Sequence, residues 1–309
     1  MSTPIFSVII PAYNAATTLR STVETVLSQS LSDFEVLIID DGSTDDTVRV
    51  ALRIAAEDMR VRVVSQPNEG VSSARNFGAE LAKGRLLAFL DADDQWAPDK
   101  LERHHALHDA DPMLDASFAQ IEFCADEEGT MAAGRTVSSV PQGYLDMADV
   151  VTENPVCTAS NFVIDREVFE DLGGFSTRMR YAEDQEILAL LLSEGGTLLG
   201  IDAPLVRYRL SEGGLSCDFE AMLDGWRSFA CNWLSEGDLA PAEATYCRYL
   251  TRRALRSGAG IEVARSFARR GLAADRAGFM AGGARSILTL GGVVAGGAMP
   301  GSLRRAVFA

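Results

Sequence analysis

The first hundred residues alternate short apolar runs with segments of helical periodicity. Runs rich in leucine and β-branched residues, which are typical of strands, cover residues 6–10, 34–39, 61–64 and 86–90. The segments between them have apolar residues every three to four positions, which predicts helices over 15–29, 44–58 and 71–83. Because these strands are apolar throughout rather than alternating, we expect both of their faces to be covered. The pattern predicts an α/β protein with a mostly parallel central sheet and flanking helices.

The alternation weakens after residue 115, where the pattern still predicts strands over 116–123, 161–164, 197–201 and 205–210. Helices are predicted over 165–172 and 183–193, and a loop or a hairpin over 126–143. From residue 218 onward the chain is typical of helices, over 219–234, 241–257 and 261–274, followed by a basic, Gly/Ala-rich tail. We therefore expect an α/β domain over 1–217 and a C-terminal helical region over 218–309.

Each of the first four predicted strands ends in polar, loop-forming residues. These ends are residues 11–14, 40–43, 66–70 and 91–94. In an open α/β sheet the ligand lies beyond the carboxyl ends of the strands. The pattern therefore predicts one site at this edge of the sheet.

Three carboxylates stand at the end of the fourth strand, in Asp91-Ala92-Asp93-Asp94. Like charges at short range repel, and they stay ionised together only when a cation or a ligand offsets them. The structural alternative is the N-cap of a helix that begins near Pro98. A cap needs only one carboxylate, so the tetrad favours a metal or phosphate site.

Three further segments have both a structural and a functional interpretation. Capping explains the Ser and Thr after Asp40-Asp41, but not two carboxylates together at a strand end. Arg75 lies in segment 70–78, which opens the third helix, either as an ordinary helix residue or as a donor to a ligand. Glu183 and Asp184 stand in the first turn of a helix, where the macrodipole favours acids and where a general base would also fit.

The three histidines, His104, His105 and His108, fall in one predicted helix. The spacing of His104 and His108 suits a metal, but no Glu-x-x-His pattern accompanies it, so a solvated helix face is favoured. The strings typical of esterases, dinucleotide dehydrogenases and P-loop proteins do not occur in the sequence.

The composition narrows the class of partner. A net charge of −16 argues against nucleic-acid binding, which depends on neutralising phosphates. Five scattered cysteines without a C-x-x-C pair indicate reduced thiols and a cytoplasmic location. We expect neither a signal peptide nor a transmembrane helix, because the N-terminus lacks a basic segment and no apolar stretch is long enough.

Six motifs follow one another in a fixed order along the first 215 residues or so. They are PAYN at 11–14, DDGSTDDT at 40–47, NEGVSSARNFG at 68–78, LDADD at 90–94, SNFVIDREVFEDLGGF at 160–175 and AEDQE at 182–186. This combination closely resembles the inverting glycosyltransferase family 2, whose members have the GT-A fold and use nucleotide-sugars.

The resemblance implies a role for each matching residue. Asp91 and Asp93 would bind Mn²⁺ or Mg²⁺, and Asp184 would be the catalytic base. The predicted nucleotide-binding residues are Pro11, Ala12, Tyr13, Asp40, Asp41, Arg75 and Ala92. Ser160, Asn161 and Glu183 would lie near the donor sugar or the acceptor, and Arg209 would contact phosphate.

The implied reaction is transfer of a sugar from a nucleotide-diphosphate sugar, in the first place a UDP-sugar, to a glycan or lipid-linked acceptor in cell-surface or exopolysaccharide synthesis. One departure from the family pattern is Tyr208-Arg209-Leu210-Ser211, where Ser211 stands at the place of a His that lies near the diphosphate or metal. The alternatives are a catalytically silent subunit that binds a nucleotide-sugar or a glycan, and a nucleotidyltransferase.

The tail over 278–309 is Gly/Ala-rich, basic and nearly free of acids, unlike the acidic remainder of the chain. Arginines interleave with apolar residues at positions 265, 269, 270, 276, 285, 304 and 305. This pattern suits peripheral contact with an anionic membrane surface. It suits equally well helices that pack on the α/β domain with their arginines outward.

Overall fold

A computed structural model describes residues 3–127, 130–132, 136–210, 218–257 and 259–297. The chain forms two compact units. The first comprises residues 1–145, 155–178 and 186–209, and the second comprises residues 146–154, 179–185 and 210–309. The boundary between two domains after residue 217 stays a prediction.

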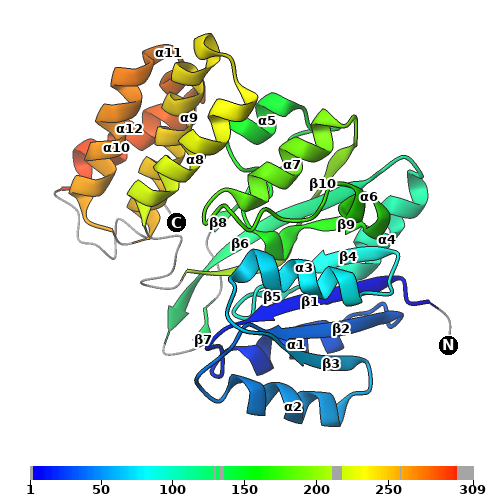
Figure 1. The fold of residues 1–309 in the computed structure, drawn as a ribbon. Helices are drawn as coiled ribbons and strands as arrows, with labels where there is room; N and C mark the ends of the chain where they lie inside the picture. The colour runs from blue at the N-terminus through cyan, green and yellow to red at the C-terminus, as the bar shows by residue number, and fades with distance from the viewer. Residues whose placement is uncertain (1–2, 128–129, 133–135, 211–217, 258, 298–309) are drawn as a thin grey trace. The chain divides into compact units, whose positions relative to one another are not determined.

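The first unit is built on a ten-stranded sheet (Figure 1). Its order is β3-β2-β1-β4-β9-β6-β10-β5, and β7 and β8 both pair with β6. The strands are β1 Phe6–Ala12, β2 Phe34–Asp40, β3 Val61–Ser65, β4 Leu86–Phe89, β5 Gln95–Trp96, β6 Ala116–Glu127, β7 Thr130–Met131, β8 Thr136–Val137, β9 Val163–Asp165 and β10 Leu198–Leu210.

The four N-terminal strands pair in parallel, as the continuous apolar runs predict. The register places Ala12 opposite Asp40 and Asp40 opposite Ser65, so these strands end at the same edge of the sheet. β9 then joins β4 antiparallel, and β6 joins β9 antiparallel. The sheet is therefore mixed, with its parallel half formed by the first ninety residues.

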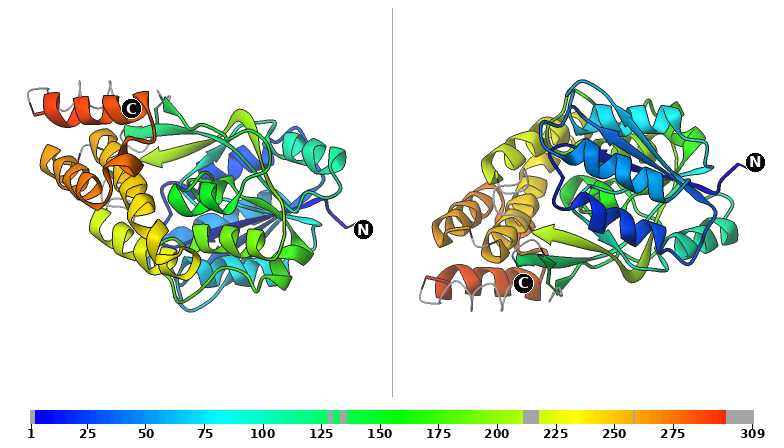
Figure 2. Two further views of the ribbon diagram at one scale, coloured as in Figure 1. Left: turned by 90° about the horizontal axis from the view of Figure 1, so that it is seen from above. Right: turned by 90° about the horizontal axis from the view of Figure 1, so that it is seen from below.

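Helices flank the sheet within the first unit, and helices make up most of the second unit (Figures 1 and 2). They are α1 Leu19–Leu27, α2 Thr47–Glu57, α3 Val71–Leu81, α4 Lys100–Ala110, α5 Met147–Thr152, the 3₁₀ turn η1 Ala159–Asn161, α6 Arg166–Asp171, α7 Glu183–Ser193, α8 Phe219–Trp233, α9 Glu236–Arg256, α10 Ile261–Ala274, α11 Arg276–Met280 and α12 Ala284–Ala295. Among the helices in the described part of the chain, none combines the length and the apolar composition needed to cross a membrane.

Several elements differ from the predicted ones. The two strands predicted over 197–210 form the single strand β10, and the short β5, which pairs with it, was not predicted. α4 begins at Lys100 with Asp99 as its N-cap, so Pro98 lies before the helix. The described parts of segment 126–143 include the antiparallel pair of β6 and β7, which agrees with the predicted hairpin. α11 and α12 were not predicted, because their glycines and alanines carry a weak periodic signal.

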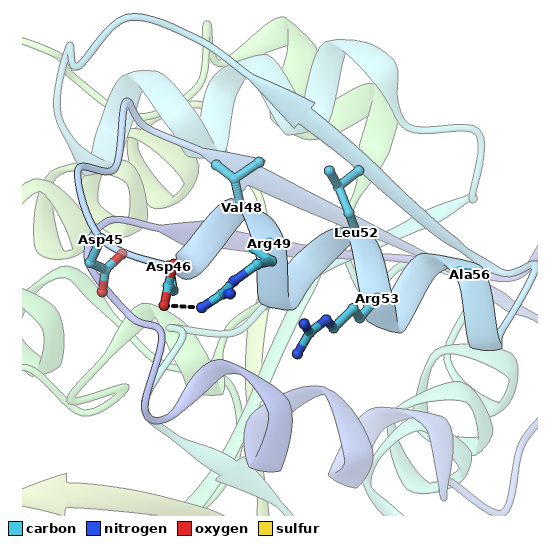
Figure 3. Close-up of a pocket in the computed structure, with 7 residues that line it drawn as sticks. All are labelled: Asp45, Asp46, Val48, Arg49, Leu52, Arg53 and Ala56. Carbon is cyan, nitrogen blue, oxygen red and sulfur yellow. Dashed lines mark hydrogen bonds and ion pairs between the residues drawn. The ribbon is translucent and has the colours of Figure 1, made fainter.

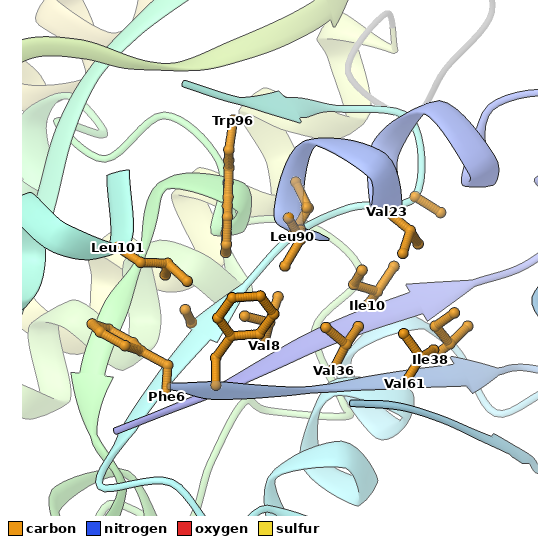
Figure 4. Packing of buried hydrophobic residues seen from close by; sticks show 14 of the residues in the cluster. Phe6, Val8, Ile10, Val23, Val36, Ile38, Val61, Leu90, Trp96 and Leu101 are labelled. Carbon is orange, nitrogen blue, oxygen red and sulfur yellow. The ribbon is translucent and has the colours of Figure 1, made fainter. Parts of the chain in front are cut away.

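The main core lies between the sheet and the helices α1 and α2 (Figure 4). Phe6, Val8 and Ile10 alternate along β1 and point into this cluster. α3 packs close to the sheet at Ile9, because a Cβ on Gly78 would lie 2.5 Å from Ile9 Cγ2. A glycine is therefore required for α3 to approach the sheet this closely.

The prediction of a solvated histidine face is wrong for His104 and His108, which are both buried together with Lys100. These three residues are spaced by four along α4 and therefore share one face. Lys100 Nζ lies 3.0 Å from His104 Nε2. Ser117 Oγ lies 2.7 Å from His104 Nδ1 and 2.9 Å from His108 Nε2. α4 therefore has a buried face made of polar side chains, and these side chains bond to one another and to Ser117.

Burial makes this group reluctant to carry positive charge. It lowers the pKa of Lys100 from 10.5 to about 7. Burial, together with the charge of Arg85, lowers the pKa of His108 to about 4. The pKa of His104 lies well below its ordinary value because of burial and of the neighbouring Lys100 and His108.

Lys100→Met is expected to reveal a pH dependence of stability. Lys100 has a lower pKa in the folded state than in the unfolded state, so the folded state binds fewer protons. The free energy of unfolding of the wild type relative to the variant should therefore rise from pH 7 to pH 10, by at most roughly 1.4 kcal/mol per pH unit. Chemical denaturation across this range measures the difference. The same comparison with Lys83→Met, an exposed lysine, should be flat; a flat difference for Lys100 as well would contradict the prediction.

Candidate active site

The loops after β1 and β2 are joined by hydrogen bonds from Asn14. Its Oδ1 accepts a bond of 2.8 Å from the Thr44 amide, and its own amide donates to Ser43 Oγ at 3.0 Å. Asn14 has a φ of 52°, a left-handed conformation that asparagine tolerates better than most residues. The end of β1 is therefore fixed to the start of the segment that leads into α2.

Asp41 fixes the third loop to the same edge. It is buried, and its Oδ1 accepts from Gln66 Nε2 at 2.8 Å and from the Glu69 amide at 2.9 Å. Its Oδ2 accepts from the Gly70 amide at 2.9 Å. Asp41 thus shapes the loop that precedes α3. Its predicted contact with a nucleotide base stays a prediction, and Gln66 is a partner that the sequence did not indicate.

The other residues predicted to line the nucleotide pocket lie close by. Asp40 is buried and accepts from the Ser43 amide at 3.2 Å. Pro11 and Ala12 are buried in β1, whereas Tyr13 is exposed. Tyr13 is thus the residue of this group with the most side-chain surface to offer a base.

Arg75 and Asp91 form an ion pair at the end of β4. Arg75 Nη2 lies 2.6 Å from Asp91 Oδ1, and the exposed fractions of the two side chains are 4% and 27%. The guanidinium lies 5.3 Å from the centre of the Phe175 ring, and Thr158 Oγ1 donates to Asp91 Oδ2 at 3.4 Å. A largely buried arginine holds a partly exposed carboxylate, a geometry that fixes the direction of Asp91.

Asp94 is the buried member of the tetrad. Its Oδ2 accepts from Ser160 Oγ at 2.6 Å, and its Oδ1 accepts from the Arg209 amide at 2.9 Å. Ser160 Oγ also accepts from the Asp91 amide at 2.9 Å. Asp94 therefore fixes the loop after β4 to both η1 and β10.

The carboxylates of the tetrad repel one another, as their sequence predicts. Burial raises the pKa of Asp94 well above its ordinary value, and the charges of Asp93 and Asp91 raise it further. The hydrogen bonds from Ser160 and Arg209 act in the opposite direction. Three neighbouring carboxylates thus have different environments, with Asp94 inside and Asp91 and Asp93 at the surface of the loop.

Asp93 and Arg209 lie together. The Arg209 side chain is buried, and its Nε donates to the backbone carbonyl of Asp93 at 2.9 Å. Among the described residues, no cluster of three or more His, Cys, Asp or Glu side chains could hold a metal by itself. Asp91 and Asp93 nevertheless suit Mn²⁺ or Mg²⁺, since Mg²⁺ takes one or two carboxylates and completes its shell with water and substrate phosphates.

The burial of Ser160 and Asn161 argues against direct contact with a sugar. Both side chains are fully buried. Asn161 Nδ2 donates to the carbonyls of Ala119 and Val156 at 2.6 and 3.0 Å, and its Oδ1 accepts from the Ala119 amide at 2.9 Å. The geometry supports a positioning role for both residues, and their predicted location near the donor sugar or the acceptor stays a prediction.

Ala92, predicted to contact the nucleotide, is also largely buried. Its side chain belongs to the main core, and its carbonyl accepts from Thr22 Oγ1 at 3.1 Å. Ala92 therefore fixes the loop between the two carboxylates that it separates.

Glu183 and Asp184 begin α7 within the second unit. They follow Ala182, which has a φ of 62°, an unusual conformation for alanine. Asp184 Oδ1 accepts from the Gln185 amide at 3.0 Å, and its Oδ2 accepts from Asn154 Nδ2 at 2.5 Å. Asn154 is thus a partner of the predicted base that no motif indicated. Ser211, the departure from the family pattern, lies outside the described residues.

An open hollow of about 520 Å³ lies elsewhere, along α2 (Figure 3). It is lined by Asp45, Asp46, Val48, Arg49, Leu52, Arg53 and Ala56. None of the predicted site residues belongs to this lining, so the hollow does not define the active site.

In an open α/β sheet the ligand lies beyond the carboxyl ends of the parallel strands, and Asp41, Asp91 and Asp93 follow those ends here. The profile of the family described as Glycosyl transferase family 2 matches residues 7–173. The chain belongs to this family.

Relatives extend the match beyond the profile. The chain is 31% identical over 258 residues to the Bacillus subtilis glycosyltransferase TuaG, a protein named for teichuronic acid biosynthesis; the match covers 79% of this chain and 93% of TuaG. It is 38% identical to the Escherichia coli glycosyltransferase YibD, over 49% of this chain and 42% of YibD. The match to the Pasteurella multocida chondroitin synthase, 42% identical, covers 32% of this chain and only 10% of that larger protein.

Solved structures confirm the predicted GT-A fold. TarS 1–349 of S. aureus in complex with UDP-GlcNAc superposes with a TM-score of 0.60 at 16% identity, over 88% of this chain and 90% of that one. The mannosyltransferase PcManGT from Pyrobaculum calidifontis, in complex with GDP-Man and Mn²⁺, has a TM-score of 0.60 at 19% identity. That match covers all of this chain (100%) and 85% of PcManGT.

Two substitutions at Asp94 should have different effects on stability. Asp94→Asn keeps the shape and an acceptor while removing a charge that burial disfavours, so its free energy of unfolding should stay within about 1 kcal/mol of the wild type. Asp94→Ala leaves the Ser160 hydroxyl and the Arg209 amide without their acceptor and should cost about 2–4 kcal/mol. Urea denaturation at pH 7 measures both, with exposed Asp109→Ala as the control. Equal losses in the two Asp94 variants would refute this account.

Proposed function

We propose that the protein is an inverting glycosyltransferase that moves a sugar from a nucleotide-diphosphate sugar, in the first place a UDP-sugar, to a glycan or lipid-linked acceptor. The single observation that carries the proposal is the arrangement around Asp91 and Asp93 after β4, where Arg75 pairs with the Asp91 carboxylate and Arg209 donates to the Asp93 backbone carbonyl. Family membership and the GT-A fold support it. The names of TuaG and chondroitin synthase support a role in cell-surface or extracellular polysaccharide synthesis.

The donor diphosphate would lie beside Asp91, Asp93 and the two arginines. A bound Mn²⁺ or Mg²⁺ would offset the charge that develops on the leaving nucleotide diphosphate. Asp91 and Asp93 would hold this ion, and the Mn²⁺ in the PcManGT complex supports its use. Arg75 fixes the direction of the Asp91 carboxylate, and the buried positive charge of Arg209 would favour phosphate oxygens close to Asp93.

The nucleoside would be bound at the edge formed by β1 and β2. The exposed ring of Tyr13 can cover a base, and Asp40 and Asp41 hold the surrounding loops. The UDP-GlcNAc in the TarS complex supports a uridine nucleotide as the donor. The GDP-Man in the PcManGT complex makes GDP-sugars the alternative donors to test.

Asp184 would take the proton of the acceptor hydroxyl as this hydroxyl attacks the sugar. Both of its carboxylate oxygens accept hydrogen bonds, one of them from Asn154. A donor on each oxygen fixes the rotation of the carboxylate and stabilises its ionised form, which is the form a base requires. Asn154 is thus a positioning residue for the proposed base, and neighbouring Glu183 would face the acceptor.

The proposed location is the cytoplasm, where nucleotide-sugars and reduced thiols would both be found. The competing function is a subunit that binds a nucleotide-sugar without acting on it. Release of free sugar from the donor, measured without an acceptor, separates the two, since only an enzyme breaks the bond between sugar and diphosphate.

Asp93→Asn should abolish metal-dependent donor binding. The wild type should be stabilised by a UDP-sugar with Mn²⁺, by about 2.7 kcal/mol at a hundredfold excess over Kd, and the variant should lose this gain. Transfer should fall on the order of a hundredfold or more, because the charge on the leaving group loses its support. Thermal shift and product release measure the two effects.

Asp109→Asn, at an exposed position of α4, serves as the control for Asp93→Asn. It should behave like the wild type in both assays. If Asp93→Asn bound and transferred normally, the proposed metal site would be wrong. If GDP-sugars stabilised the wild type and UDP-sugars did not, the proposed donor would be wrong but the metal site would stand.

Asp184→Asn should greatly slow sugar transfer and leave donor binding unchanged. Transfer is expected to fall by about 10²–10⁴, the usual contribution of a general base, while the thermal shift with donor stays unchanged. Asn154→Ala should give a smaller loss in kcat, of roughly tenfold, with its acid limb moved to higher pH because the carboxylate loses a donor.

Glu194→Gln, an exposed carboxylate near the end of the same helix, is the matched control and should leave kcat and its pH profile unchanged. A wild-type rate in Asp184→Asn would remove Asp184 from the mechanism. If Asp184→Asn were inactive but Asn154→Ala had the pH profile of the wild type, Asp184 would remain the proposed base. Asn154 would then not be its positioning residue.

A further inference from the structure

Helix α12 exposes the side chains that a packed helix normally buries. Ile287, Leu288 and Val294 have exposed fractions of 63%, 67% and 79%. Its buried positions are instead the small residues Ser286, Thr289 and Gly292. Residues 287, 288, 291 and 294 recur at helical spacing, so the exposed apolar side chains lie on one face. We call these three side chains the α12 face.

The α12 face is not needed to hold the helix in place. Leu290 and Val293, on another side of α12, pack against the core cluster formed by Ala244, Ala268 and Phe279. Ser286 Oγ donates to the Phe279 carbonyl at 2.8 Å, and Thr289 Oγ1 donates to the Arg285 carbonyl at 2.7 Å. The buried side of α12 is therefore already complete, and the α12 face adds apolar surface on the solvent side. In Figure 2 α12 is the red helix, and it lies at the margin of the helices of the second unit.

The sequence from α11 onward is basic. After Asp275 the sequence contains four arginines, at positions 276, 285, 304 and 305, and no acidic residue, although the whole chain has a net charge of −16. Arg285 is exposed on α12 itself. Burial and the charges of Arg285 and Arg248 lower the pKa of Arg252, with Glu153 opposing them. Like charges held near one another favour an anionic partner.

We propose that the α12 face docks on an anionic lipid bilayer, with Ile287, Leu288 and Val294 in the acyl boundary and Arg285 at the phosphate level. An apolar helix face bordered by arginine is the chemistry that interfacial helices use. Each arginine near an anionic surface adds to the attraction, and the effect is screened by salt. A helix that lies in the interface in this way does not cross the membrane.

A second copy of the chain is a poorer occupant of the same face. A two-fold interface would place the α12 face against its own copy, and α12 contains no acidic residue that a second copy could offer to Arg285. Anionic lipid phosphates, in contrast, would supply a partner for the charge of Arg285. The charge pattern therefore favours the bilayer.

Vesicle flotation of the full chain tests the proposal. The wild type should float with phosphatidylglycerol-containing vesicles, less with pure phosphatidylcholine, and less again at high salt. Ile287→Glu/Leu288→Glu should lower the bound-to-free ratio by about tenfold or more, because two apolar side chains lose their burial. Arg285→Gln should lower it by roughly fivefold on the anionic vesicles only.

The matched control is Leu52→Glu, which places a glutamate at an exposed leucine on α2 in the other unit. This variant should float like the wild type, and circular dichroism should show that the α12 variants keep their helices. Failure of the wild type to float, or equal flotation of wild type and Ile287→Glu/Leu288→Glu, would overturn the proposal. So would a dimer in sedimentation velocity that this double variant dissociates. The assay contains no nucleotide-sugar, so its result is independent of transfer activity.

Discussion

The hydrogen bonds of buried Asp94 are the constraint on which the first unit's site depends. Asp94 accepts from Ser160 in η1 and from the Arg209 amide in β10, two segments distant in the sequence from the end of β4. Ser160 in turn accepts from the Asp91 amide, and Arg209 donates to the Asp93 carbonyl. One buried carboxylate thus fixes the backbone of both proposed metal ligands. Its burial is tolerated because both oxygens have a donor, since an unpartnered buried carboxylate would be costly.

This constraint separates the tetrad into two functions. Asp91 and Asp93 remain at the surface of the loop, and Asp94 is withdrawn into the protein. The buried Lys100 below the same region donates to the Asn161 carbonyl at 3.5 Å, and Trp96 Nε1 donates to the Ser160 carbonyl at 2.8 Å. The turn that holds Asp94 is therefore itself held from the interior side. Polar groups inside the core fix the geometry here, where apolar packing alone would be less directional.

The parallel half of the fold was predictable because its strands are continuous apolar runs and their polar ends are adjacent in the sequence to those runs. The predicted edge carrying Asp41, Asp91 and Asp93 rests on that local signal. The residues that form hydrogen bonds to the site carboxylates from distant segments of the chain have no such local signal. Gln66, Ser160 in its contact with Asp94, and Asn154 all act through hydrogen bonds whose donor and acceptor are 25 to 66 residues apart. The face of Lys100, His104 and His108 was misjudged for a related reason, since its polar residues are satisfied by Ser117 in β6, which periodicity does not reveal.

The second unit is more than an extension of the α/β unit, because it contains the residues that fix the proposed base. Trp226 Nε1 in α8 donates to the Val151 carbonyl at 2.8 Å, and Gln185 Nε2 donates to the Val150 carbonyl at 2.9 Å. Arg248 in α9 donates to Glu153 at 2.8 Å. These bonds hold the segment that ends in Asn154, the residue bonded to Asp184. α9 also packs against α12, so a bilayer bound at the proposed α12 face would be connected through α9 to the segment around Asp184. For an acceptor anchored in lipid, the proposed base and the proposed membrane-binding face would then belong to the same unit, which gives a physical reason for the two features to occur in one part of the chain.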